Sequence, residues 1–296
     1  MRSGFGEILS NIERMEHFIE AAADKNVEVV CFPEMSITGY ALKEEIKEFA
    51  ESVPGPSTRV VQRMAQKYEI VVLAGLAERT GGGIAITQIV ASPDGEMDIY
   101  RKLHLSEGEQ ALFQAGGDIP VFTKGRTVFG MQLCYDAHFP ELSTLLALKG
   151  AEVLFIPHAS PAPESPEEKR RRWSRYLAAR AYDNSVFVVA CNQTGDGGAG
   201  IRFSGVALIL DPRGNVIAKT SGDDEEMIIA ELKGEVLAKT RTARMGFFLP
   251  QRRPELYAGL TMPGGDTALG WPRRDNGSGE QRTPEGIINA QAALDT

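Results

Sequence analysis

The 296-residue sequence has few cysteines and histidines. Its three cysteines, Cys31, Cys134 and Cys191, include no Cys-x-x-Cys pair. So low and odd a count is typical of a reducing compartment and excludes a disulfide framework. The four histidines form no His-x-x-x-His pair, so we predict no zinc or other metal site.

Long apolar runs and a surplus of positive charge are also missing. No stretch approaches the roughly 20 apolar residues of a membrane-spanning helix, and residues 1–7 contain no apolar signal-peptide core. The formal net charge of −8 disfavours nucleic acid and anionic membranes, because like charges repel. We therefore expect a cytoplasmic protein with no nucleic-acid partner and no membrane partner.

Apolar periodicity predicts helices that alternate with strands. Helices are expected at residues 11–23, 57–68, 140–149 and 165–182. Strands are expected at 27–32, 70–76, 84–91, 96–101, 128–134, 153–157, 186–191, 205–210, 216–219 and 227–231. Ser10 is the predicted N-cap of the first helix. This alternation, with its hairpins, predicts an α/β layered domain with mixed sheets.

The composition divides the chain near residue 260. Gly, Pro, Asp, Asn, Ser and Arg crowd residues 263–284, which show little apolar periodicity. We therefore predict one domain over residues 1–260 and an extended or disordered tail over 261–296.

Three segments place a reactive side chain at or just beyond the carboxyl end of a predicted strand, where ligands gather in α/β sheets. Glu34 follows the strand 27–32, and burial there would raise its pKa and suit it to act as a base. Lys102 ends the strand 96–101, where a fixed ammonium can stabilise an oxyanion. Cys134 ends the strand 128–134 at a turn whose backbone N–H groups would lower the thiol pKa. Taken singly, each has an ordinary structural reading as a helix cap, a surface lysine or a core cysteine.

The combination resembles the nitrilase, or carbon–nitrogen hydrolase, superfamily. The resemblance rests on Phe-Pro-Glu-Met-Ser-Ile-Thr-Gly-Tyr at 32–40, Tyr-Arg-Lys-Leu-His-Leu at 100–105 and Leu-Cys-Tyr-Asp-Ala-His-Phe-Pro-Glu-Leu at 133–142. Further similar segments lie at 180–192, 205–216 and 253–257, so the resemblance covers residues 7–260.

This resemblance implies a four-layer αββα sandwich and a triad of Glu34, Lys102 and Cys134. Cys134 would attack an amide carbonyl, Glu34 would move the protons, and Lys102 with the Tyr135 N–H would hold the oxyanion. A thioester would form and be hydrolysed, with no cofactor. The family's second glutamate matches Glu109 rather than Glu107.

The resemblance also bears on the substrate. Cys-Tyr-Asp at 134–136 is similar to the amidase-like branches, whereas true nitrilases usually carry Cys-Trp-Glu. We expect Tyr40, Tyr135, His138 and His158 to contact substrate; His138 stands where many amidase-like members have arginine, and a packed histidine is the alternative for both histidines.

Four readings of function remain open. A hydrolase of carbon–nitrogen bonds other than peptide bonds, cleaving a small linear amide or N-carbamoyl compound, is favoured. The alternatives are acyl transfer or ammonia supply to a synthetase, a nitrile-hydrolysing nitrilase, and a non-catalytic scaffold. The family further implies a homodimer or higher homo-oligomer, and a first strand before residue 8 that this chain is expected to lack.

Two patterns have simpler explanations. Gly195–Gly200 fits Gly-x-Gly-x-x-Gly, but strand rather than helix is expected after it, which disfavours a phosphate-binding loop. The basic run 169–172 follows Glu167 and Glu168, and we expect its charges mostly on the solvated face of a helix.

Overall fold

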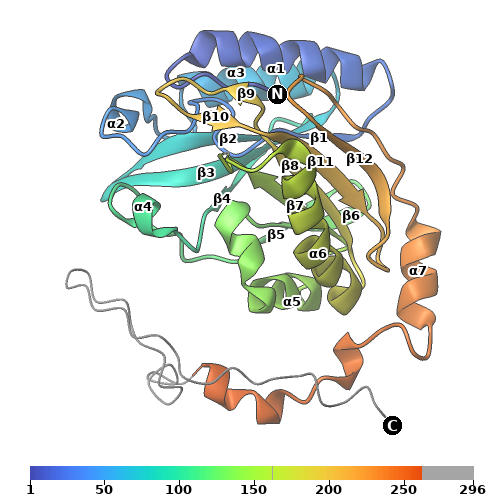
Figure 1. Cartoon of the computed structure of the whole chain (residues 1–296). Helices are drawn as coiled ribbons and strands as arrows, with labels where there is room; N and C mark the ends of the chain where they lie inside the picture. The colour runs from blue at the N-terminus through green and yellow to red at the C-terminus, as the bar shows by residue number, and fades with distance from the viewer. Residues whose placement is uncertain (162, 262–296) are drawn as a thin grey trace. The chain divides into compact units, whose positions relative to one another are not determined.

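The structure is a computed structural model that describes residues 1–161 and 163–261. It contains two units, residues 1–250 and residues 251–296. The larger unit holds two β-sheets with helices on their outer faces (Figure 1). The predicted tail at 261–296 falls, apart from its first residue, outside the described residues.

The first sheet has the order β1-β2-β3-β4. Its strands are β1 (Val29–Cys31), β2 (Val71–Thr80), β3 (Gly83–Ala91) and β4 (Met97–Arg101). β1 runs parallel to β2, and the other neighbours are antiparallel. Among the described residues β1 pairs on one side only, with β2, so it is an edge strand.

The second sheet has the order β12-β11-β8-β7-β6-β5. Its strands are β5 (Val121–Lys124), β6 (Thr127–Met131), β7 (Val153–His158), β8 (Phe187–Asn192), β11 (Gly205–Leu210) and β12 (Val216–Gly222). The central strands β6, β7 and β8 are parallel, and the outer pairings are antiparallel. Both sheets are therefore mixed, as the sequence predicts.

Alternate residues of each central strand pack into different layers. In β2, Leu73 belongs to the cluster between the sheets, whereas Val72 belongs to the cluster under α1 (Ile8–Ala23) and α3 (Pro56–Lys67). In β7, Phe155 faces the first sheet, and Leu154 packs under α5 (Pro140–Leu148) and α6 (Pro166–Asn184). The period of two along a strand thus builds four layers, αββα.

The short elements complete the unit. They are α2 (Ile46–Phe49), α4 (Glu107–Gln110), the 3₁₀ helix η1 (Cys134–His138), β9 (Gly195–Asp196), β10 (Arg202–Phe203), α7 (Gly234–Thr242) and η2 (Leu249–Gln251), which runs into the second unit. Residues 195–203 form the hairpin β9–β10, so the glycine-rich run opens no helix and offers no dinucleotide loop. The second unit contains the 3₁₀ helices η3 (Pro254–Leu256) and η4 (Ala258–Leu260).

Two local predictions are wrong. α1 begins at Ile8 with Glu7 at its N-cap, so Ser10 lies inside the helix. The predicted strand at 227–231 is irregular, because a strand needs the backbone groups of a neighbour and this segment has no ladder partner among the described residues. No helix in residues 1–161 and 163–261 is long and apolar enough to cross a membrane.

Candidate active site

Glu34 lies three residues beyond β1 and its side chain is fully buried. Two buried amide side chains hold the backbone on either side of it. Gln193 Nε2 donates to the Glu34 carbonyl at 2.9 Å, and Gln88 Nε2 donates to the Phe32 carbonyl at 3.1 Å. Gly75 of β2 passes so close that a Cβ there would lie 2.3 Å from the Met35 nitrogen. The glutamate is therefore held firmly where the two sheets meet.

Lys102 follows the last residue of β4, and its side chain is 1% exposed. Its Nζ donates to Glu34 Oε1 at 2.8 Å and to Glu109 Oε1 at 2.7 Å. The strand period explains this direction, since the neighbouring Arg101 points away and pairs with Glu78. Lys102 and Glu34, from different parts of the first sheet, are thereby in direct contact.

Glu109 lies in α4 and is buried, as the family resemblance implies for the second glutamate. Its Oε2 accepts the Ser106 N–H at 2.8 Å, which closes a capping box at the start of the helix. Its Oε1 also accepts the Tyr40 hydroxyl at 3.2 Å. Tyr40 therefore contacts Glu109 directly, and Glu107 takes no part in this cluster.

Two carboxylates share one ammonium in this buried cluster, which sets its electrostatics. Burial raises the pKa of Glu34 to about 7, and the attraction of Lys102 opposes the shift. Burial lowers the pKa of Lys102, but the charges of Glu34, Cys134 and Glu109 outweigh it and raise the pKa overall. The cluster thus keeps a charged lysine beside a carboxyl group that can gain or lose a proton near neutral pH.

Cys134 occupies a strained turn between β6 and α5. It begins η1 with a φ of +44°, a left-handed value that non-glycine residues rarely adopt. The Ala159 N–H and the charge of Lys102 both lower the thiol pKa. Burial and the nearby carboxylates of Glu34 and Glu109 prevail, however, and the pKa is raised. The predicted lowering of the thiol pKa is therefore wrong for the free protein.

Asp136 is a buried side chain that sequence reasoning missed. Its Oδ1 accepts from the His104 N–H and contacts His104 Nδ1, both at 2.8 Å. Its Oδ2 accepts from the Tyr100 hydroxyl at 2.7 Å and the Leu133 N–H at 2.9 Å. The carboxylate thereby ties η1 to the segment after β4, linking the turn of Cys134 to the segment of Lys102. The Tyr-Asp pair that follows Cys134 was the only sequence signal for this role.

The remaining predicted site residues lie along the face where η1 meets α6. Tyr135 is 40% exposed and its ring lies 5.7 Å from that of His138. The His138 ring in turn lies 4.9 Å from Tyr176 of α6. His158 is buried and stacks on Trp173 at 3.8 Å, with Nδ1 at 2.7 Å from the Ile156 carbonyl and Nε2 at 3.3 Å from the Tyr176 hydroxyl. The structure thus gives His158 the packed arrangement and leaves Tyr135 and His138 accessible.

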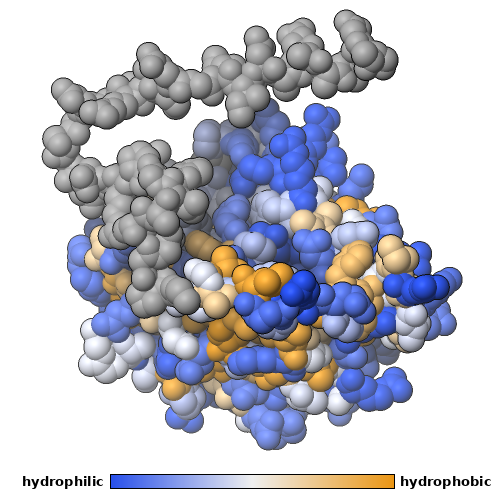
Figure 2. All heavy atoms as spheres, turned by 90° about the horizontal axis from the view of Figure 1, so that it is seen from below, coloured by the Kyte–Doolittle hydropathy of each residue, from blue (hydrophilic) through white to orange (hydrophobic). Residues whose placement is uncertain are grey.

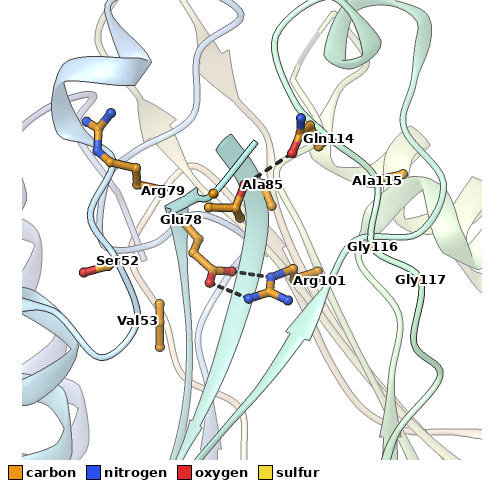
Figure 3. A pocket seen from close by; sticks show the side chains of 12 residues that line it. Ser52, Val53, Glu78, Arg79, Ala85, Arg101, Gln114, Ala115, Gly116 and Gly117 are labelled. Atoms are coloured by element: carbon orange, nitrogen blue, oxygen red, sulfur yellow. Dashed lines mark hydrogen bonds and ion pairs between the residues drawn. The ribbon is translucent and has the colours of Figure 1, made fainter. Parts of the chain in front are cut away.

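A cavity of about 500 Å³ lies elsewhere, beside the ends of β2 and β4 (Figure 3). Glu78 and Arg101 form a two-bond ion pair in it, with both N–O distances 2.6 Å, and Thr87 donates to the same carboxylate at 2.7 Å. Both oxygens of this carboxylate therefore have partners, and Glu34, Lys102, Glu109 and Cys134 do not line the cavity. Within the described residues, no group of three or more His, Cys, Asp or Glu is placed to hold a metal ion.

The chain matches known proteins over most of its length. The profile of the family "Carbon-nitrogen hydrolase" matches residues 4–242. A nitrilase of Pyrococcus abyssi is 31% identical, with 83% of this chain and 92% of the relative covered. The 2-oxoglutaramate amidase of Bacillus subtilis is 32% identical, with 80% and 90% covered.

Among solved structures, the carbon–nitrogen hydrolase of Helicobacter pylori superposes with a TM-score of 0.78 at 28% identity, covering 89% of this chain and 96% of that one. This superposition over most of both chains shows that the two proteins share a fold. The chain therefore belongs to the carbon–nitrogen hydrolase family of the nitrilase superfamily, and it is a hydrolase of carbon–nitrogen bonds other than peptide bonds.

Proposed function

We propose that the protein hydrolyses a small linear amide or N-carbamoyl compound through a thioester on Cys134, releasing ammonia. The observation that carries this proposal is the buried cluster in which Lys102 Nζ bridges Glu34 and Glu109 at 2.8 and 2.7 Å. The charges of all three groups act on the Cys134 thiol. A nucleophile, a proton carrier and a fixed cation therefore lie together out of bulk water.

The first half-reaction forms the acyl-enzyme. As the Cys134 sulfur attacks the amide carbonyl carbon, its proton passes to Glu34, whose pKa of about 7 suits both uptake and release. The carbonyl oxygen becomes negative, and Lys102 stabilises it together with the Tyr135 N–H, which lies in the first turn of η1 and so lacks a partner within that helix. Glu34 then protonates the leaving nitrogen, the C–N bond breaks and ammonia departs.

The second half-reaction releases the acid. Glu34, now ionised again, takes a proton from a water that attacks the thioester carbonyl, and the carbon–sulfur bond breaks to return the Cys134 thiol. The raised thiol pKa helps here in one respect, since a neutral Cys134 in the resting site does not compete with substrate for the charge of Lys102. Glu109 holds the lysine in place throughout with Tyr40 as its partner.

The exposed side of the site favours an amide with an anionic group at its far end. Arg172 lies one helical turn before Tyr176 on α6, and its charge acts on Cys134, Tyr176 and His138. It is 39% exposed and held in position by Glu164 at 2.8 Å. This cation near Cys134, with the name of the B. subtilis relative, supports a carboxylate-bearing amide among the candidate substrates.

Acyl transfer to another amine, supply of ammonia to a partner synthetase, and nitrile hydrolysis are the competing activities. A nitrile uses the same thiol but would give a thioimidate first, and the Pyrococcus relative bears the name nitrilase. The Tyr-Asp that follows Cys134 favours the amidase branch over this alternative.

We propose a homodimer or larger assembly in which α5 and α6 form the contact. The view from below, toward α5, shows apolar side chains gathered on part of that face (Figure 2). Leu145 and Leu148 of α5 and Tyr182 of α6 are 43%, 48% and 49% exposed. Light scattering at micromolar concentration should give at least twice the mass of the chain, and Leu148→Glu should lower it. A monomeric wild type would contradict this proposal.

The activity is tested by assaying ammonia release from a panel of ω-amides of dicarboxylic acids, neutral linear amides, N-carbamoyl amino acids and nitriles. We expect the first group to give the highest kcat/KM, and intact-mass spectrometry after rapid quench to show an acyl adduct on Cys134. A Cys134→Ala variant that keeps near-normal turnover would overturn the mechanism.

A further inference from the structure

Lys169 is buried, although it begins a basic run that the sequence places on a solvated helix face. Its side chain is fully inaccessible. Its Nζ donates to the Ser160 carbonyl at 2.6 Å, the Ser160 hydroxyl at 3.2 Å and the Pro161 carbonyl at 2.7 Å. In the described part of the chain these neutral oxygens are its only hydrogen-bond partners, since the nearby Glu164 pairs with Arg172 instead.

Burying an ammonium group among neutral oxygens is energetically unfavourable. Removing an ammonium from water without a carboxylate partner carries a large desolvation penalty. The penalty shows in the pKa of Lys169, which burial lowers to about 8 against the opposing attraction of Glu164. The neighbouring Arg171 on α6 is 69% exposed, so the burial of Lys169 calls for an explanation in what it holds.

What Lys169 holds is the segment that follows β7. Asn192, at the end of β8, also hydrogen-bonds to Ser160. Its Oδ1 accepts the Ser160 N–H at 2.8 Å, and its Nδ2 donates to the Ser160 carbonyl at 3.0 Å. Ser160 directly follows Ala159. The Ala159 N–H donates to Glu34 Oε2 at 2.8 Å, and it lowers the pKa of both Glu34 and Cys134.

We propose that Lys169 is a positioning residue of the active site, which with Asn192 fixes Ser160 so that the Ala159 N–H stays aimed at Glu34 and Cys134. The inference rests on the proposed function only in so far as those two groups carry the chemistry. One backbone N–H serves the charged forms of both the proton carrier and the nucleophile. A small shift of this loop would turn the Ala159 N–H and so disturb two steps of the reaction at once.

Lys169 also contributes its charge. It attracts a thiolate at Cys134, and the other charged groups that face it are Glu164 and Arg172. Losing the lysine therefore removes a cation and loosens the Ala159 N–H. Both changes raise the pKa of Cys134, and the second also raises the pKa of Glu34.

The experiment compares Lys169→Met and Lys169→Arg with Arg171→Met. Arg171 lies on the same helix and its side chain is 69% exposed, so it is the matched control. Alkylation of Cys134 by iodoacetamide is followed from pH 6 to pH 10 by peptide-resolved mass spectrometry, which separates it from Cys31 and Cys191, and kcat/KM for an amide is measured over the same range.

For Lys169→Met we expect the alkylation profile and the acid limb of kcat/KM to move to higher pH. The rate at pH 7 should fall about tenfold or more, as for the loss of one hydrogen bond to a charged group. Lys169→Arg should recover most of this, and Arg171→Met should match the wild type. A folded Lys169→Met protein with unshifted profiles overturns the inference, even if its kcat is lower.

If Lys169→Met fails to fold, Asn192→Ser carries the same prediction, because it loses both Asn192 bonds to Ser160 while Lys169 remains. An unshifted profile in that variant also overturns the proposal. If the wild type releases ammonia from none of the compounds, the proposed function fails separately, and the alkylation profile still decides the role of Lys169.

Discussion

Replacing Asp136 by Asn tests how the turn of Cys134 is held. Each carboxylate oxygen accepts one backbone N–H, from His104 at Oδ1 and from Leu133 at Oδ2. An asparagine can offer only one oxygen, so in either orientation its NH₂ group faces a backbone N–H that cannot accept. The other two partners, the Tyr100 hydroxyl and His104 Nδ1, can adapt by rotating or by changing tautomer.

The expected loss follows from that one orphaned donor. A buried N–H without an acceptor costs about 1–3 kcal/mol of unfolding free energy. For a chain of this size the melting temperature should fall by about 2–8 °C. Because the affected N–H groups lie at Leu133 and His104, on either side of the catalytic cluster, kcat/KM at 25 °C should fall about tenfold beyond any loss of folded protein.

Asp98→Asn is the control. Asp98 pairs with Lys124 at 3.0 Å, but its side chain is 46% exposed, so its removal should change the unfolding free energy by less than about 0.5 kcal/mol. Urea denaturation and the rate of Cys134 alkylation are measured for both variants. The reasoning is refuted if Asp136→Asn unfolds at the same urea concentration as Asp98→Asn and its cysteine reacts at the wild-type rate.

Three further predictions concern the cluster itself. Cys134→Ala should reduce turnover by several orders of magnitude, whereas Cys191→Ala should act on the urea midpoint alone; equal losses of activity would contradict the assignment. Burial raises the pKa of Glu34 from 4.5 to about 7. In the pH window between these two values the folded protein keeps a proton on Glu34 that the unfolded chain has released. The stability from Glu34 therefore declines as pH rises through the window, and Glu34→Gln should gain in unfolding free energy relative to the wild type between pH 5 and pH 8; an unchanging difference would be inconsistent with the shift. Tyr40→Phe removes one hydrogen bond to Glu109 and should lower kcat/KM less than tenfold, whereas Glu109→Gln should lower it at least a hundredfold because Lys102 loses a charged partner; the reverse order would refute the role of Glu109.

The site residues that could be predicted from the sequence are those that follow the end of a strand. Glu34, Lys102 and Cys134 each follow an apolar run, and the sheets bring those ends together for the same reason that they bury the runs. The layers were predictable in the same way, since β2 and β7 carry apolar residues on both faces and must be covered twice.

Local signals failed where the outcome depends on distant backbone. Ser10 has the composition of a helix cap, but the preceding turn lets α1 begin at Ile8. Residues 227–231 have the composition of a strand, but strand formation depends on a neighbour that composition does not specify. The prediction of the thiol pKa failed similarly. The local N–H groups were foreseen, whereas burial and two carboxylates raise the pKa, and those carboxylates belong to residues about 100 and 25 positions earlier in the chain.

Lys169 and Asp136 show that the site depends on more residues than the reactive ones that its motifs supply. Lys169 stands in a run of four basic residues, and only its place on α6, facing the segment after β7, separates it from its solvated neighbours. Asp136 lies in a recognised motif, yet its partners belong to the chain around Tyr100 and His104. In both cases the side chain acts on the cluster through backbone N–H groups, whose directions depend on the packing of the two sheets. The reactive side chains can thus be recognised from residue types. The residues that position them can be identified only once the register of the strands is known.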